Sequence, residues 1–127
     1  MQEVTSTLPA TALNWFYIPA NDLDRAVRFY GTILEAPLRV GDFGGERVAV
    51  FAHREDGAGG ALVKGTPSSA GTLVYLNADG RLDRALALVE GAGGSIAAPK
   101  AALPNGMGYS AEIIDSEGNR VGLHANP

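Results

Sequence analysis

The sequence predicts an α+β protein built from two βαβββ modules, and three observations support this fold class. The tetrapeptide LDRA occurs at Leu23–Ala26 and again at Leu82–Ala85. Each copy follows a short apolar run and a polar break, and each precedes three strand-like segments. The repeated order divides the chain into a first module at 13–64, a linker at 65–71 and a second module at 72–124.

An amphipathic helix is predicted at each copy of the repeat. Apolar residues recur at positions i, i+3, i+4 and i+7, the spacing of a helix that buries one face: Leu23, Ala26, Val27 and Tyr30, then Leu82, Ala85, Leu86 and Val89. Asn21 or Asp22 is expected to cap the first helix by accepting free backbone N–H groups, and Asp79 the second. The segment Gly91–Gly94 should end the second helix.

Short β-strands account for the rest of each module. The first module offers strands at 13–18, 37–40, 47–52 and 61–64, and the second at 72–76, 95–98, 109–114 and 120–124. Turn-forming residues separate them, among them the segments 42–45 and 115–119.

The composition fits a single domain covering residues 1–127. Ten Lys and Arg residues stand against 14 Asp and Glu, a net charge of -4, without a basic stripe, which argues against nucleic-acid binding. No apolar run approaches the roughly 18 residues of a membrane helix. Residues 1–12 lack the pattern of a secretory signal, so a cytoplasmic protein is expected. Zero cysteines exclude thiolate chemistry.

Three segments carry a family resemblance: Ile18–Ala26 running into Phe29-Tyr30, Gly91–Gly94 after the second helix, and Asp115–Val121. Together with the order of elements, they resemble the vicinal oxygen chelate superfamily, which includes glyoxalase I, extradiol dioxygenases and bleomycin-resistance proteins. The resemblance implies that the sheets curl around an open cleft with the helices outside, and that the chain forms a homodimer. It does not fix the reaction, because this superfamily hosts both enzymes and binding proteins.

The resemblance also implies a divalent metal on the cleft floor, at positions that lack donor atoms in this chain. The first ligand position, seven residues before Asp22, holds Trp15, and its repeat counterpart is Leu73. The last position, seven residues after Asp115, holds Gly122, and its first-module counterpart falls near Leu62. Indole, alkyl and hydrogen side chains offer no lone pair to a divalent ion. No metal cofactor is therefore expected at the usual positions.

Strand alternation predicts which side chains face the cleft. The predicted ligand-binding residues are Trp15, Tyr17, Leu62, Leu73, Ser110, Glu112, Gly122 and His124. Because Glu112 is a carboxylate on an otherwise apolar strand, it is a candidate general base, assisted by His124 and by His53. The favoured alternative is that Glu112 forms an ion pair with Lys64 or an arginine.

Three interpretations of function remain open from the sequence. The first is metal-free binding of a small apolar or aromatic molecule, as in the bleomycin-resistance branch. The second is a metal-dependent or proton-shuttling enzyme, a glyoxalase- or dioxygenase-related lyase or oxidoreductase that uses Glu112 and His124. Its metal-dependent form would hold a divalent ion at a displaced site made from Glu112, His124 and His53. The third is a ligand-free interaction module whose cleft is filled by its own side chains.

Overall fold

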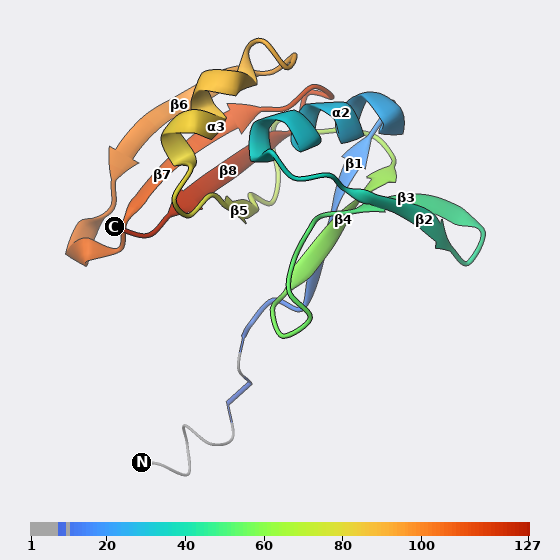
Figure 1. The fold of residues 1–127 in the computed structure, drawn as a ribbon, viewed down its shortest axis with the longest axis horizontal. Coiled ribbons are helices and arrows are strands. Elements are labelled where there is room, and N and C mark those ends of the chain that lie inside the picture. The colour runs from blue at the N-terminus through green and yellow to red at the C-terminus, as the bar shows by residue number, and fades with distance from the viewer. Residues whose placement is uncertain (1–7, 10) are drawn as a thin grey trace.

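A computed structural model describes residues 8–9 and 11–127, and it contains two βαβββ modules (Figure 1). The first consists of β1 (Trp15–Ala20), α2 (Leu23–Leu34), β2 (Arg39–Phe43), β3 (Glu46–Val50) and β4 (Gly59–Lys64). The second consists of β5 (Tyr75–Asn77), α3 (Leu82–Val89), β6 (Ser95–Ala102), the 3-10 turn η1 (Pro104–Gly106), β7 (Tyr109–Ile114) and β8 (Arg120–Ala125). The expectation of no secretory signal over residues 1–12 falls largely outside the described residues.

Each module folds into its own four-stranded sheet, and the two sheets have the same topology. The strand order is β1-β4-β3-β2 in the first sheet and β5-β8-β7-β6 in the second. In both sheets the first strand of the module pairs in parallel with the last, and the other pairs are antiparallel. The predicted α+β class and the internal repeat are therefore confirmed.

Strand boundaries differ from the predicted ones near glycines. β2 continues through Phe43, so only Gly44-Gly45 forms the turn expected at 42–45. Both glycines have positive φ, +57° and +89°, which suits a tight hairpin. β4 begins at Gly59, two residues earlier than expected, and its first two residues are glycines that lie against aromatic rings.

The two helices begin differently although they share a sequence motif. Asp22 caps α2, because its side chain accepts a hydrogen bond from the backbone N–H of Arg25 at 3.0 Å. At the start of α3, Arg81 occupies the N-cap without a side-chain cap. The expectation that Asp79 caps α3 is wrong: its carboxylate instead accepts hydrogen bonds from the backbone N–H and the side-chain amide of Asn126.

One apolar core joins the two modules on the helix-bearing side of the sheets. Figure 1 shows α2 and α3 side by side above the sheets, and the two helices contact each other. α2 contributes four nearly inaccessible residues, Ala26, Phe29, Tyr30 and Ile33, and α3 contributes Leu82, Ala85 and Val89. The modules are thus packed through their helices rather than held by a shared strand ladder.

A buried polar group on the turn between β7 and β8 adds a specific link between the modules. Asp115, Glu117 and Asn119, which we call the hairpin cluster, are all buried. The Asp115 carboxylate accepts a hydrogen bond from the Tyr30 hydroxyl of α2 at 2.7 Å. It also accepts hydrogen bonds from the backbone N–H groups of Glu117 and Asn119, at 2.9 Å each.

Glu117 extends this link to the start of α2. Its carboxylate accepts hydrogen bonds from the Arg25 guanidinium at 2.7 and 2.9 Å and from the backbone N–H of Asp22 at 2.9 Å. The Arg25 side-chain hydrogen bond is the main reason that the pKa of Glu117 falls to about 2.

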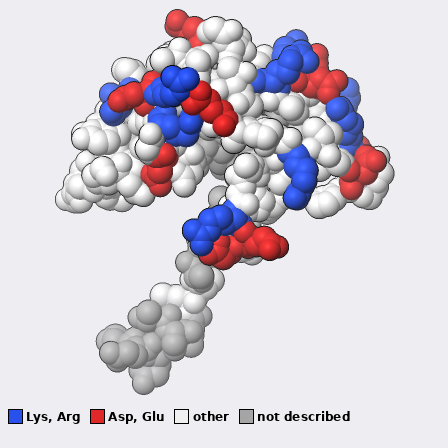
Figure 2. All heavy atoms as spheres, viewed as in Figure 1, with Lys and Arg blue, Asp and Glu red and all other residues white. Residues whose placement is uncertain are grey.

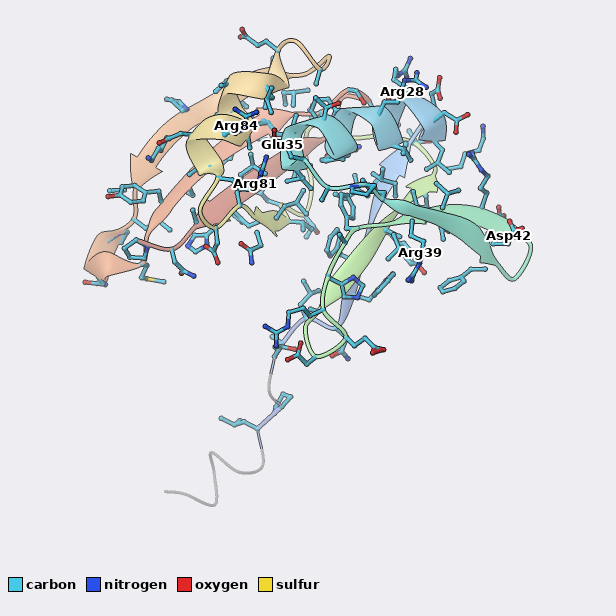
Figure 3. All side chains as sticks on the ribbon, viewed as in Figure 1. Arg28, Glu35, Arg39, Asp42, Arg81 and Arg84 are labelled. Atoms are coloured by element: carbon cyan, nitrogen blue, oxygen red, sulfur yellow. The ribbon has the colours of Figure 1, made fainter. Side chains whose placement is uncertain are left out.

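A second polar link lies at the other end of α2 (Figure 3). Glu35, just after the helix, accepts hydrogen bonds from Arg84 at 2.7 Å and from Arg81 at 3.0 Å. Arg81 also donates a hydrogen bond to the backbone carbonyl of Ile33 at 2.9 Å. Both ends of α2 are therefore anchored to the second module by ionic hydrogen bonds.

Charged side chains of both signs are interspersed over the face seen in Figure 2. No helix within the described ranges is long and apolar enough to span a membrane.

Candidate functional site

β1 presents aromatic side chains on both of its faces. Phe16 faces the helices and packs against Phe51, with the ring centroids 5.6 Å apart. Trp15 and Tyr17 lie on the face of the sheet opposite the helices, here called the outer face, where the sequence placed the cleft. Their rings meet edge-to-face with the centroids 6.5 Å apart. Tyr17 is 56% exposed, so the outer face keeps an accessible aromatic surface.

Trp15 covers a second, smaller apolar cluster on this outer face. The cluster consists of three buried residues, Val48, Val50 and Ala61, with Trp15 and Val63 packed against them. Trp15 therefore contributes to packing within the first module.

The cleft was expected on the face of the sheet away from the helices. Leu62 does not lie on that face, so its predicted place in the cleft is wrong. Its side chain is fully buried in the core on the helix side, beside its register partner Ile18. Because neighbouring strand residues point to opposite faces, Ala61 and Val63 are the residues that β4 presents outward.

In the second module, Tyr75 covers the backbone of Gly122. These residues are register partners on β5 and β8, and a Cβ at position 122 would lie 2.4 Å from the Tyr75 ring. A larger residue at 122 would therefore require the tyrosine ring to move.

Glu112 and His124 lie on β7 and β8, and each has a protein partner. Glu112 accepts a hydrogen bond from Arg120 Nε at 2.6 Å, the type of ion pair that the sequence left open. His124 is the register partner of Ser110, and its Nε2 donates to the Met107 carbonyl at 2.8 Å. Within the described part of the chain, no hydrogen bond joins Glu112 to His124.

The residues at the positions of the implied metal do not fit a divalent ion. Trp15, Leu73 and Gly122 carry no donor lone pair, and β4 offers only aliphatic side chains between Ala61 and Val63. The Tyr75 ring also covers Gly122. Among the residues that the structure describes, no group of three His, Asp or Glu side chains is gathered to hold a metal, so Glu112, His124 and His53 are not brought together.

A cavity of about 620 Å³ lies at the junction of the two modules. Its lining comes from β1, the end of α2, the loop between β3 and β4 (residues 51–58, here the β3–β4 loop), the start of β4, and β5. Figure 2 shows the molecule hollowed between the modules on the side away from the helices. The larger apolar and aromatic lining residues are Leu13, Phe16, Leu34, Phe51, Tyr75 and Leu76, and the polar ones are His53, Arg54, Asp56 and Asn77.

Three contacts hold the His53 ring on the face of the first sheet that also carries Trp15. Its Nδ1 donates to the Phe51 carbonyl at 2.8 Å. Its ring lies flat on Gly59, where a Cβ would come within 2.4 Å of the imidazole, and the Trp15 ring lies edge-on with a centroid distance of 5.8 Å. Because a carbonyl can only accept, the neutral imidazole carries its proton on Nδ1 and its lone pair on Nε2.

Sequence reasoning named His53 but missed this cavity. None of the eight predicted cleft residues lines it. The signal that could have found it is the pair Gly59-Gly60 at the start of β4, since the rings of His53 and Phe16 lie directly on these two glycines.

Comparisons with known proteins agree with this architecture. Residues 12–123 match the family model of the Glyoxalase/Bleomycin resistance protein/Dioxygenase superfamily. No curated protein matches the chain.

Three solved structures illustrate the fold. A glyoxalase/bleomycin resistance protein from Albidiferax ferrireducens is 17% identical with a TM-score of 0.68, over 91% of this chain and 100% of that one. An antibiotic binding protein from a Streptomyces species is 22% identical with a TM-score of 0.65, over 94% and 99%. A lactoylglutathione lyase from Agrobacterium tumefaciens is 21% identical with a TM-score of 0.62, over 93% and 96%. At these identities the similarity shows the fold alone.

Proposed function

Because the chain belongs to the Glyoxalase/Bleomycin resistance protein/Dioxygenase superfamily, we propose that it binds a small aromatic or apolar molecule at the module junction without using a metal ion. The observation that carries this proposal is the cavity of about 620 Å³. Ligand sites typically enclose roughly 300 to 1,000 Å³, with mostly apolar walls and a few polar groups. The antibiotic binding protein among the similar structures supports a binding role for this fold.

The aromatic walls favour a flat ligand. Phe16 and Phe51 present adjacent rings from the first module, and Tyr75 contributes a half-exposed ring from the second. Aromatic side chains bind planar apolar molecules through burial of surface and through edge or offset ring contacts. A ligand between these walls would contact both modules at once.

The test is calorimetric titration with a panel of one- to three-ring aromatic compounds. Ala58 lines the cavity from an exposed position in the β3–β4 loop, so Ala58→Phe should fill the space without disturbing the core. We expect binding to the unaltered protein and at least about tenfold weaker binding to Ala58→Phe. The matched control Ala102→Phe, on exposed β6 away from the cavity, should bind normally. Failure of every compound to bind, or equal binding to both variants, contradicts the proposal.

Metal independence is tested separately by dialysis against a chelator. Removing a metal ion that binds the native state would lower the melting temperature. Because the proposed binding uses no metal, we expect the melting temperature and the ligand affinity to stay unchanged. A lower melting temperature would instead favour the enzyme alternative that uses Glu112 and His124. The engagement of Glu112 by Arg120 makes that alternative the weaker one.

We further infer that the protein is a homodimer. Several aromatic residues remain substantially exposed, including Tyr17, Phe43 and Tyr75, and burying such apolar surface between two copies would favour association. Sedimentation analysis should give a mass near twice 13.1 kDa. A monomer at tens of micromolar protein would contradict this inference.

A further inference from the structure

β2 is a sheet edge that no other part of the described chain covers. All of its residues, Arg39–Phe43, are exposed, including the apolar side chains of Val40 and Phe43. Figure 1 shows the β2–β3 hairpin projecting from the molecule on the side away from the second module. An uncovered edge presents backbone N–H and C=O groups that can pair with a strand of another chain.

The other edge strands are less suited to such pairing. β6, the corresponding edge of the second sheet, contains Pro99, which has no N–H, and its ladder with β7 is interrupted by two register shifts. β1 and β5 border the cavity between the modules. β2 contains no proline and pairs with β3 in a regular register over its whole length. Proline and bulges commonly protect edge strands, and β2 has neither.

The hairpin register identifies which backbone groups of β2 point outward. Phe43 and Glu46 flank the two-residue turn Gly44-Gly45, so they form a hydrogen-bonded pair. Hydrogen-bonded and non-hydrogen-bonded pairs alternate along an antiparallel ladder, which assigns every second residue of β2, counted back from Phe43, to β3. The N–H and C=O groups of Val40 and Asp42 therefore face the free edge.

The ladder between β3 and β4 supports the same assignment. The backbone N–H of Phe51, just after β3, donates to the Gly60 carbonyl at 2.9 Å. Alternate residues of β3 thus bond to β4, and those between them, including Val48, bond to β2. Val48 is the register partner of Gly41, so the backbone groups of Gly41 are bonded inward.

Resting on the homodimer inferred above, we propose that two copies of this chain join through their β2 edges, antiparallel and centred on Gly41, so that their first sheets become continuous. In this register Val40 of each copy lies opposite Asp42 of the other, and the outward N–H and C=O groups form two hydrogen-bonded pairs. Because β2 carries one arginine and one aspartate, it has no net charge, and two copies do not repel each other there.

Side chains on the outer face add a second contact in this register. Arg39 is the register partner of Val50, a member of the outer apolar cluster, so Arg39 and Phe43 lie on that face. Arg39 of one copy lies opposite Phe43 of the other, where a guanidinium and an aromatic ring attract each other. This contact occurs twice in the dimer and covers part of the Phe43 ring, which is 62% exposed in one copy.

Val40→Pro tests the backbone pairing, because it removes an N–H that faces the free edge and leaves the ladder with β3 intact. Val40→Thr keeps this N–H in a β-branched residue and is the matched control. In sedimentation analysis of the full chain over a concentration series, we expect a dissociation constant at least about tenfold higher for Val40→Pro and an unchanged one for Val40→Thr.

The outcomes separate this inference from the one on which it rests. If Val40→Pro dimerises as tightly as the unaltered protein, or if both variants weaken the dimer equally, pairing through β2 is overturned while the homodimer stands. If the unaltered protein is a monomer, the homodimer inference has failed, and pairing through β2 fails with it.

A charge exchange tests the register and uses only exposed positions. Phe43→Lys places a lysine opposite Arg39 of the other copy, and we expect the dissociation constant to rise at least about fivefold. Adding Arg39→Glu to this variant creates opposite charges at the same two positions and should restore most of the lost affinity. If the double variant is no tighter than Phe43→Lys alone, the proposed register is wrong.

Hydrogen exchange on the unaltered protein covers the case in which Val40→Pro does not fold. The amide N–H groups of Val40 and Asp42 should exchange several-fold more slowly where the dimer predominates than after dilution to the monomer, because the dimer pairs them. The amide of Glu55, in the exposed β3–β4 loop, should exchange equally under both conditions. Exchange of Val40 and Asp42 that does not depend on concentration would contradict the pairing.

Discussion

The last connection of each module occupies the same place in the repeat, but it is exposed in the first module and carries buried polar residues in the second. In the first module, the β3–β4 loop covers residues 51–58 and is exposed from Ala52 to Ala58. In the second, the turn at 115–119 carries the hairpin cluster, in which Asp115 is only 3% exposed. Figure 1 shows the first connection extending away from the helices and the second lying beside α2.

The difference shows that one connection stabilises the contact between the modules while the other contributes to the proposed binding cavity. The polar groups of the hairpin cluster form hydrogen bonds with Tyr30, Arg25 and the backbone. These groups therefore hold the modules together and are not available to a ligand. The β3–β4 loop makes few such contacts, and several of its exposed residues line the cavity. Binding residues commonly lie on loops supported by a rigid scaffold.

Removing the central carboxylate of the hairpin cluster should have the largest effect on stability. Asp115→Ala leaves the Tyr30 hydroxyl and two backbone N–H groups without their acceptor in a buried site. We expect a loss of about 3 to 5 kcal/mol in the free energy of unfolding, measured by urea denaturation. Asp56→Ala in the β3–β4 loop removes an exposed carboxylate and should cost less than about 0.5 kcal/mol. Similar losses for the two variants would remove the contrast between the connections.

Acid should weaken the same cluster through Glu117. Its pKa is about 2 in the folded protein against 4.5 for the unperturbed group, so its contribution is complete above about pH 4.5 and is lost as the pH falls toward 2. Between pH 6 and pH 3, the unaltered protein should lose on the order of 1 to 2 kcal/mol more stability than Glu117→Gln, since half-exposed Arg25 is partly screened by water. Urea titrations at the two pH values provide the measurement, and parallel losses for both proteins would show that the Glu117–Arg25 pair does not stabilise the fold.

Local patterns were sufficient to predict the module order, both helices and a cap at Asn21 or Asp22, of which the structure uses Asp22. These features depend on periodicity and on hydrogen bonds within a few residues, which a sequence displays directly. Asp79 shows the limit of such signals. It lies where a cap is expected, but a partner distant in the sequence, Asn126, takes its carboxylate.

The site was harder to predict because it depends on register between distant strands. The third residue of β8 is Gly122 and the third residue of β4 is Ala61, and their register partners are Tyr75 and Tyr17. Because the β3–β4 loop and the β7–β8 turn differ in length, a count along the chain places the counterpart of Gly122 near Leu62, one residue away from Ala61. A shift of one residue moves a side chain to the opposite face of a strand, which is why Leu62 belongs to the core.

The smallest expected effect concerns the two helix starts, of which only that of α2 has a side-chain cap. Asp22→Ala removes the acceptor for the Arg25 backbone N–H and should cost about 1 kcal/mol in urea denaturation. Asp22→Asn keeps an acceptor oxygen and should cost less than half of that. The backbone N–H of residue 22 still reaches Glu117 in both variants, so the hairpin cluster is retained and the comparison isolates the cap. An equal loss in both variants would mean that the negative charge near the helix end, rather than the capping hydrogen bond, distinguishes α2 from α3.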